Sequence, residues 1–136
     1  MIENAIAVPM FLIFLLITFD LLRLCYCRLS LQFALTDTVR RFSMNPGIDA
    51  DADLQQRLAR VGVNWQPATD SLTYCPRSIF YTNCPTGTQD AGHPREAMIF
   101  QADMKMNALL PGSQGSLLQA ATVTLSTSVL SRNEPN

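Results

Sequence analysis

The first 23 residues, "MIENAIAVPMFLIFLLITFDLLR" (1–23), decide the architecture of this chain. The 15 residues from Ala5 to Phe19 carry no charge, and three leucines that follow extend the apolar stretch. The total approaches the roughly 20 residues that a membrane-spanning helix needs. Two acids bracket the stretch, with Glu3 before it and Asp20 near its end. We therefore predict one membrane-spanning helix at the start of the chain.

A cleaved signal peptide is the alternative interpretation of this segment, because its core is apolar too. Such a peptide carries basic residues before the core and a small-residue cleavage site behind it. Here Glu3 precedes the core and "DLLRLCYCR" (20–28) follows it. We favour a helix that stays attached to the protein.

The composition sets the scale of the rest of the chain. A length of 136 residues allows one small domain. The balance of 10 basic and 11 acidic residues gives no reason to expect a nucleic-acid partner, which usually requires a basic patch. Most of the apolar excess lies in the first 35 positions, so residues beyond them resemble an ordinary soluble module.

The helical pattern continues past the apolar stretch. One stripe at helical spacing contains Leu24, Cys27, Leu31, Leu35, Val39 and Phe42. We expect an amphipathic extension to about Ser43, standing in water above the membrane. This divides the chain into a transmembrane and stalk helix, residues 1–43, and a head domain, residues 44–136.

The head begins with the helix breaker "MNPGID" (44–49) and a short helix in "DADADLQQRLARVG" (49–62). Asp49 or Asp51 can cap the start of this helix, and Gly62 marks its stop. A calcium loop is the alternative interpretation of its aspartates, but the glycine and terminal glutamate of such a loop are missing. We favour helix capping.

The remaining sequence alternates with the period of β-strands. "AMIFQADMKM" (97–106) and "TVTLSTSVL" (122–130) each place apolar residues on one face, which predicts half-buried antiparallel strands. Weaker strand candidates cover residues 61–65 and 72–81. The predicted fold class is α+β: a long N-terminal helix, a short helix and a small antiparallel sheet.

The cysteines bear on the compartment. Cys75 and Cys84 enclose "CPRSIFYTNC" (75–84), a spacing that favours a disulfide in an oxidising compartment. Metal ligation by this pair is the alternative, but no second pair completes a site. Arg23 and Arg28 after the span argue the other way, for a cytoplasmic head. We favour the disulfide and a head outside the cytoplasm.

Two further cysteines lie on the first helix. Cys25 and Cys27 are two residues apart, so they do not share a helix face and are not expected to bond to each other. They are either small apolar packing residues, which we favour, or sites of cross-linking between copies.

No pattern in the chain predicts catalysis. The single histidine, His93, has no sequence partner that would orient it as a base. Phosphate loops and zinc signatures are missing from the sequence. We expect no enzymatic activity, no catalytic or metal-binding residues, no cofactor and no small-molecule substrate.

The two acids of the apolar segment need an explanation, because a charge in lipid costs at least about 2.5 kcal/mol at the helix centre. Asp20 and Arg23 are three residues apart, on one helix face, where they can screen each other. Glu3 has no basic neighbour in the chain. It either reaches headgroup water or pairs with a group outside, such as the amino terminus of another copy.

The two ends of the chain together resemble the TadE/TadF pseudopilins of tight-adherence (Flp-type) pili. The N-terminal segment has the family's order of residues: Glu3, Pro9, Asp20, Arg23, Arg40 and Arg41. The C-terminal "VTLSTSVLSRNEP" (123–135) looks like the family's closing strand and its Arg-x-Glu-Pro ending, here Arg132, Asn133, Glu134 and Pro135. The resemblance covers about 45 residues at the start and about 15 at the end.

The resemblance implies a pilin-like fold and the role of a minor pseudopilin in a Tad (type IVc) pilus. Glu3, Pro9, Asp20 and Arg23 would then be subunit-contact residues, and the partners would be other pilins, the Tad assembly platform and membrane lipid. The implied location is the bacterial inner membrane, with the head in the periplasm and possible incorporation into the extracellular pilus. Family members are trimmed after a glycine. Only two residues precede Glu3, so either the true start lies upstream, or this chain is trimmed, or it is unprocessed.

A second hypothesis explains the span and the disulfide equally well. In it the chain is a single-span envelope protein whose periplasmic head binds a ligand or partner in a sensor or secretion complex. A membrane-tethered hydrolase is a third, which would need an activated residue that the sequence does not reveal.

Overall fold

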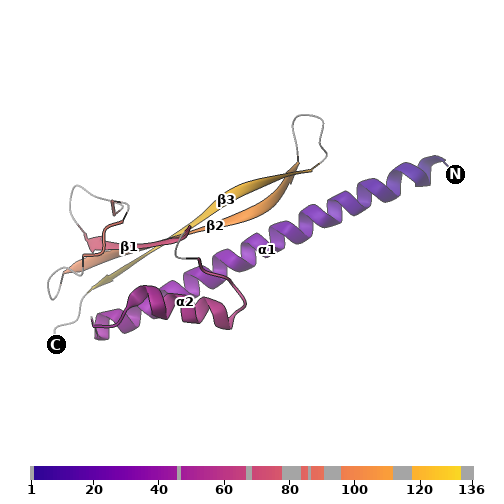
Figure 1. The fold of residues 1–136 in the computed structure, drawn as a ribbon. Coiled ribbons are helices and arrows are strands. Elements are labelled where there is room, and N and C mark those ends of the chain that lie inside the picture. The colour runs from indigo at the N-terminus through magenta and orange to yellow at the C-terminus, as the bar shows by residue number, and fades with distance from the viewer. Residues whose placement is uncertain are drawn as a thin grey trace.

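The chain folds into a long helix with a small sheet along one side (Figure 1). The structure is a computed structural model that describes residues 2–45, 47–66, 69–77, 84–85, 87–90, 96–111 and 118–132. For residues 2–6, 109–111 and 118–120 it describes the backbone alone. The order of elements is α1, α2, β1, β2, β3, which confirms the predicted α+β class with a helix-plus-sheet head.

Helix α1, Ile2–Met44, runs the length of the molecule (Figure 1). Its 43 residues correspond to about 65 Å at 1.5 Å per residue. The helix continues through Pro9, whose nitrogen has no hydrogen to donate to the carbonyl four residues earlier. It ends one residue beyond the predicted Ser43, before the Asn45–Asp49 connection.

Helix α2, Ala50–Arg60, forms where the capping pattern predicted it. The Asp49 side chain accepts hydrogen bonds from the backbone N–H groups of Asp51 and Ala52, at 3.1 and 3.3 Å. These bonds satisfy donors that the first turn of a helix leaves free. The predicted stop is confirmed as well, because Gly62 has a φ of +75°, a conformation that residues with a Cβ rarely adopt.

The sheet consists of β1 (Ser71–Pro76), β2 (Ala97–Pro111) and β3 (Leu118–Arg132), in the order β1-β2-β3 and antiparallel throughout. Strand β1 pairs with β2 only from Pro76↔Met98 to Ser71↔Asp103. Strands β2 and β3 pair along their full length, from Ala97↔Arg132 to Pro111↔Leu118. They therefore form a long hairpin that extends well beyond β1.

The core lies between α1, α2 and one face of the sheet. The predicted stripe of α1 is buried from Cys27 to Phe42, and Leu24 is half-buried. The predicted face of β2 is confirmed too: Met98, Phe100, Ala102 and Met104 are buried, and Met106 is partly buried against them. Each fully buried large aliphatic or aromatic side chain contributes about 1.5–3 kcal/mol.

Three aromatic rings join α1 to the sheet. Phe42 lies 5.3 Å from Tyr74 and 5.5 Å from Phe100, measured between ring centroids, and the Tyr74 and Phe100 rings stack at 5.5 Å. Burial raises the pKa of the Tyr74 phenol above its ordinary value of 10.0, and the nearby carboxylates of Asp51, Asp49 and Asp90 raise it further. The phenol is therefore held in its neutral form.

Two predicted strands differ from the structure. Residues 61–65 form no strand: Val61 and Gly62 turn, and Val63 donates its N–H back to the Leu58 carbonyl at 2.9 Å. Val63 and Trp65 are both buried, which explains the alternating pattern, but none of the described strands pairs with them. The candidate at residues 72–81 is confirmed as β1 up to Pro76, and residues 78–81 lie outside the described part of the chain.

Candidate assembly and membrane surface

The outward face of α1 stays apolar well beyond the predicted membrane span. Phe19, Leu22, Tyr26, Leu29 and Phe33 follow one another at alternating spacings of three and four residues, and all are exposed, Phe33 by 74%. We call these five residues the outward stripe. This spacing is typical of a helix that packs against another helix. This spacing is present in the sequence, but in a segment that is apolar all round it does not indicate which face the rest of the chain leaves exposed.

The inward face of α1 contains Asp20. Half-buried residues at Ile13, Ile17, Asp20 and Leu24 continue the core stripe toward the N-terminus. The Asp20 side chain is only 11% exposed, whereas its neighbour Phe19 is 67% exposed. Helix α1 contacts both β2 and β3, which run alongside it (Figure 1). Asp20 therefore faces the side of α1 that the hairpin covers.

The expected pairing of Asp20 with Arg23 is present. The Arg23 Nη1 atom lies 3.8 Å from Asp20 Oδ1, and the Arg23 side chain is 60% exposed. An exposed ion pair contributes at most about 1 kcal/mol, so this contact offsets part of the cost of an acid beside lipid. Coverage by the hairpin and the pair with Arg23 together explain how Asp20 is accommodated.

The other predicted contact residues of α1 lie nearer its start. Glu3 is in the first turn of the helix, where a negative charge is favoured by the helix dipole. Its side chain lies outside the described part, so a partner for Glu3 stays a prediction. Pro9 is exposed on the apolar half of α1.

A cavity of about 720 Å³ opens where α1, β2, β3 and the connection after α2 meet. Arg23 and Lys105 both line it, and so do the buried Cys27 and Asp70. The Asp70 carboxylate accepts backbone hydrogen bonds from Gln66 at 2.7 Å and from Lys105 at 2.9 Å. Asp70 thus fastens the connection to β2. No local motif in the sequence marks Asp70 or Lys105 as a contact residue.

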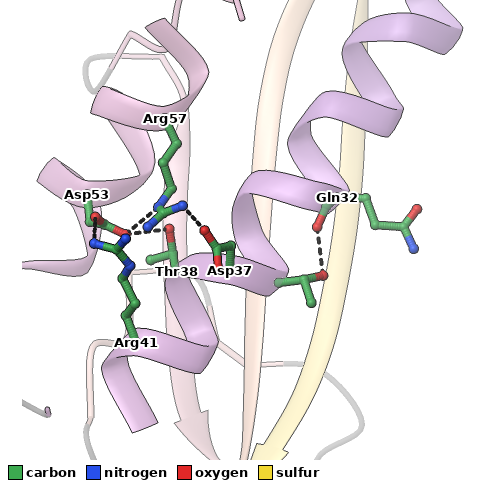
Figure 2. A network of polar contacts seen from close by, with 7 residues as sticks. Gln32, Asp37, Thr38, Arg41, Asp53 and Arg57 are labelled. Carbon is green, nitrogen blue, oxygen red and sulfur yellow. Dashed lines mark hydrogen bonds and ion pairs between the residues drawn. The ribbon is translucent and has the colours of Figure 1, made fainter. Parts of the chain in front are cut away.

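A polar network joins α2 to the second half of α1 (Figure 2). Asp53 of α2 accepts hydrogen bonds from Arg57 Nε at 2.7 Å and from the Thr38 hydroxyl of α1 at 3.0 Å. Arg41 Nη1 lies 4.0 Å from the same carboxylate, and Arg57 also pairs with Asp37 of α1. Asp53 therefore orients α2 on the helix that carries the outward stripe.

The four cysteines have three different environments. Cys75 and Cys84 form the predicted disulfide, with their Cα atoms 5.7 Å apart, and pack with Ile99 on the face of the sheet away from α1. Cys27 is a buried core residue, as expected of a small apolar side chain. Cys25 is exposed, so a bond to another copy stays a prediction for this residue alone.

The C-terminal motif is described only in part. Arg132 is the last residue of β3 and lies opposite Ala97. Asn133, Glu134 and Pro135 lie outside the described residues, as does His93. Within the part of the chain that is described, no three His, Cys, Asp or Glu side chains are grouped to hold a metal ion.

No family model, curated protein or solved structure matches this chain. Among the residues described, α1 is the one helix long and apolar enough to cross a membrane. The structure therefore consists of a small α+β head, which contains one disulfide among its described residues, and a long helix whose first half is apolar enough to enter a bilayer.

Proposed function

We propose that this chain is a minor pseudopilin, a structural and assembly subunit of a Tad (type IVc) pilus that supports pilus biogenesis and surface adhesion. The first half of α1 anchors it in the bacterial inner membrane, and the disulfide-bonded head faces the periplasm. Its partners are other pilins and the Tad assembly platform. Support comes from the resemblance at both ends of the chain, from Glu3 to Arg41 and from Val123 to Pro135.

The outward stripe is the observation that carries the proposal. In a single-span protein, lipid covers Phe19 and Leu22, but Leu29 and Phe33 stand about 10 to 17 Å beyond Leu22 along the helix, in water. Large apolar side chains gain about 1.5–3 kcal/mol each when they leave water. A stripe that is continuous from lipid into water suits a subunit that first lies in a membrane and then packs against helices of other subunits.

Piliation of cells that carry variants of the full chain tests the proposal. Glu3→Gln is expected to leave the protein in the membrane and to impair pilus assembly, because it removes the charge that a neighbouring amino terminus would neutralise. Phe33→Ser is expected to reduce piliation as well. Leu130→Ser is the matched control, because Leu130 is 56% exposed on β3 and away from the stripe. Normal piliation in both the Glu3 and Phe33 variants would refute the proposed role.

The alternative is a single-span envelope protein whose head binds a ligand or partner, and the cavity beside Arg23 and Lys105 is the feature that favours it. Copurification with a secretion ATPase complex or with sheared pili supports the pseudopilin. A stable monomer that does not copurify with any pilus component supports the alternative.

A further inference from the structure

The cavity of about 720 Å³ beside Arg23 and Lys105 serves neither the membrane span nor the outward stripe. It forms because β1 is shorter than β2. Strand β1 pairs with β2 only as far as Ser71↔Asp103, so in the described sheet the outer edge of β2 has no neighbouring strand from Met104 onward. The connection between α2 and β1 forms one wall of the gap, and α1 forms another. The volume is in the range of small-molecule sites, about 300–1,000 Å³.

The cavity has an apolar floor and a polar rim. Cys27, Val63 and Met104 line it and are buried, so they form the floor. The rim contains exposed amide and hydroxyl side chains: Asn64, Gln66, Thr69, Asn107 and Thr122. A ligand that fits this cavity therefore has an apolar part for the floor and polar atoms for the rim.

The charges of the lining decide which polar atoms fit. Among the described residues, Arg23, Lys105 and Asp70 are the charged side chains that line the cavity. Both oxygens of Asp70 already accept backbone hydrogen bonds, from Gln66 at 2.7 Å and from Lys105 at 2.9 Å, so this acid has little capacity left for a cationic ligand.

The two cations of the lining keep their donors available. The Arg23 guanidinium has a contact of 3.8 Å with Asp20, which is longer than a hydrogen bond. No described side chain forms an ion pair with the Lys105 ammonium. The cavity therefore has an excess of positive charge and favours an anion.

The backbone of β2 adds a further donor. Lys105 directs its N–H to Asp70 and therefore away from β3. In an antiparallel pair, the N–H groups of residues two apart point to the same side, so the N–H of Asn107 points to the open edge of β2 as well. Asn107 itself lines the cavity. Donors from α1 and from β2 thus border one hollow.

We propose that this cavity binds a small organic acid. Arg23 and Lys105 hold its carboxylate or phosphate group, and an apolar body of a few carbon atoms lies on Cys27, Val63 and Met104. A guanidinium binds both kinds of anion through two parallel N–H···O bonds, and an ammonium adds a compact charge. The site is built by the fold of the head on α1 and does not depend on the pilus role.

Titration of the full chain in a neutral detergent tests this proposal. Isothermal titration calorimetry measures the dissociation constants, and the fluorescence of Trp65 is the second readout. Trp65 is the single tryptophan, it is buried, and its sequence neighbours Asn64 and Gln66 both line the cavity. The probes are benzoate and phenyl phosphate, which join an anionic group to an apolar ring. Benzamide has the ring without the charge, and inorganic phosphate has the charge without the ring.

Benzoate and phenyl phosphate are expected to bind saturably and to change the fluorescence of Trp65. Benzamide should bind at least about tenfold more weakly than benzoate, because it forms no charge-assisted hydrogen bond. Inorganic phosphate should bind at least about tenfold more weakly than phenyl phosphate, because it leaves the apolar floor uncovered. If neither aromatic anion binds, or if either control probe binds as tightly as its partner, the proposal is overturned.

Variants place the binding in the cavity. Arg23→Met and Lys105→Met each remove one charge and keep an apolar stem, and each should weaken benzoate binding by at least about tenfold. Arg28→Met is the matched control, because Arg28 is exposed on the same helix and does not line the cavity. Far-UV circular dichroism and an intact disulfide establish that each variant folds. Unchanged binding in either cavity variant, or an equal loss in Arg28→Met, would overturn the proposal, whatever the result of the piliation assay.

Discussion

Replacing Asp53 with alanine is expected to destabilise the head by about 2–4 kcal/mol. The Asp53 side chain is 13% exposed and accepts hydrogen bonds from Arg57 and from Thr38, which is itself 1% exposed. Losing a hydrogen bond that involves a charged group costs about 1.5–3 kcal/mol, and leaving a buried hydroxyl without an acceptor costs about 1–3 kcal/mol. Arg57 keeps its pair with Asp37, so the sum is reduced.

Two controls separate this mechanism from a general loss of charge. Asp37→Ala also removes a carboxylate that pairs with the Arg57 guanidinium. Because Asp37 is 53% exposed, we expect the free energy of unfolding to fall by at most about 1 kcal/mol. The double variant Thr38→Val with Asp53→Ala removes donor and acceptor together. It should cost less than the sum of the two single changes, because no buried hydroxyl is then left without a partner.

Urea unfolding of the full chain in detergent measures these differences, with the fluorescence of the buried Trp65 as the reporter. Far-UV circular dichroism should follow the same transition if α2 unfolds with the head. Equal losses for Asp37→Ala and Asp53→Ala, or strict additivity of the double variant, would show that the Asp53 network does not hold α2 in the way argued above.

Three further predictions concern the head and the cysteines. Reduction of the Cys75–Cys84 bond, which closes a loop with a sequence separation of 9, should lower the free energy of unfolding by about 2.6 kcal/mol. If a Cys75→Ser, Cys84→Ser double variant lost as much unfolding free energy on addition of reductant as the unmodified protein, the disulfide would not be the cause. In detergent, a maleimide should modify the exposed Cys25 in the folded protein and the buried Cys27 only after unfolding, as read by mass spectrometry; equal rates would argue against the core position of Cys27. Because folding raises the pKa of Tyr74, the stability that its neutral phenol provides is complete below about pH 10 and is lost as the pH rises through the pKa of the folded state. The Tyr74→Phe variant should therefore lose less stability at alkaline pH than the unmodified protein. An equal loss in both proteins would refute ionisation of Tyr74 as the cause.

The sequence predicted correctly those elements in which apolar residues repeat at a regular spacing or in which a cap residue marks an end. The core stripe of α1 and the buried face of β2 follow from spacings of 3.6 and two, and the start and stop of α2 follow from Asp49 and Gly62. The same logic failed at Val63 and Trp65, where alternating burial arises without strand pairing. Pairing depends on a distant partner, which a local pattern does not contain.

The surface features were harder to predict for a related reason. Where α1 is apolar all round, the pattern carries no information about which side the hairpin covers, so the inward position of Asp20 depends on tertiary contacts. The full length of β2 and β3, 15 residues each, was also missed, because their paired ends contain runs such as Ala108 to Leu110 that do not alternate. Lys105 became notable only when the fold placed it beside Arg23.

The contact of β3 with α1 joins the last strand of the chain to its first helix. During synthesis the helix emerges first, and the cover of its inward face is complete only when β3 has joined α2 and β2 on it. A chain that stops before β3 leaves part of that face uncovered. The last strand of the chain is therefore needed to complete the core that its first helix begins.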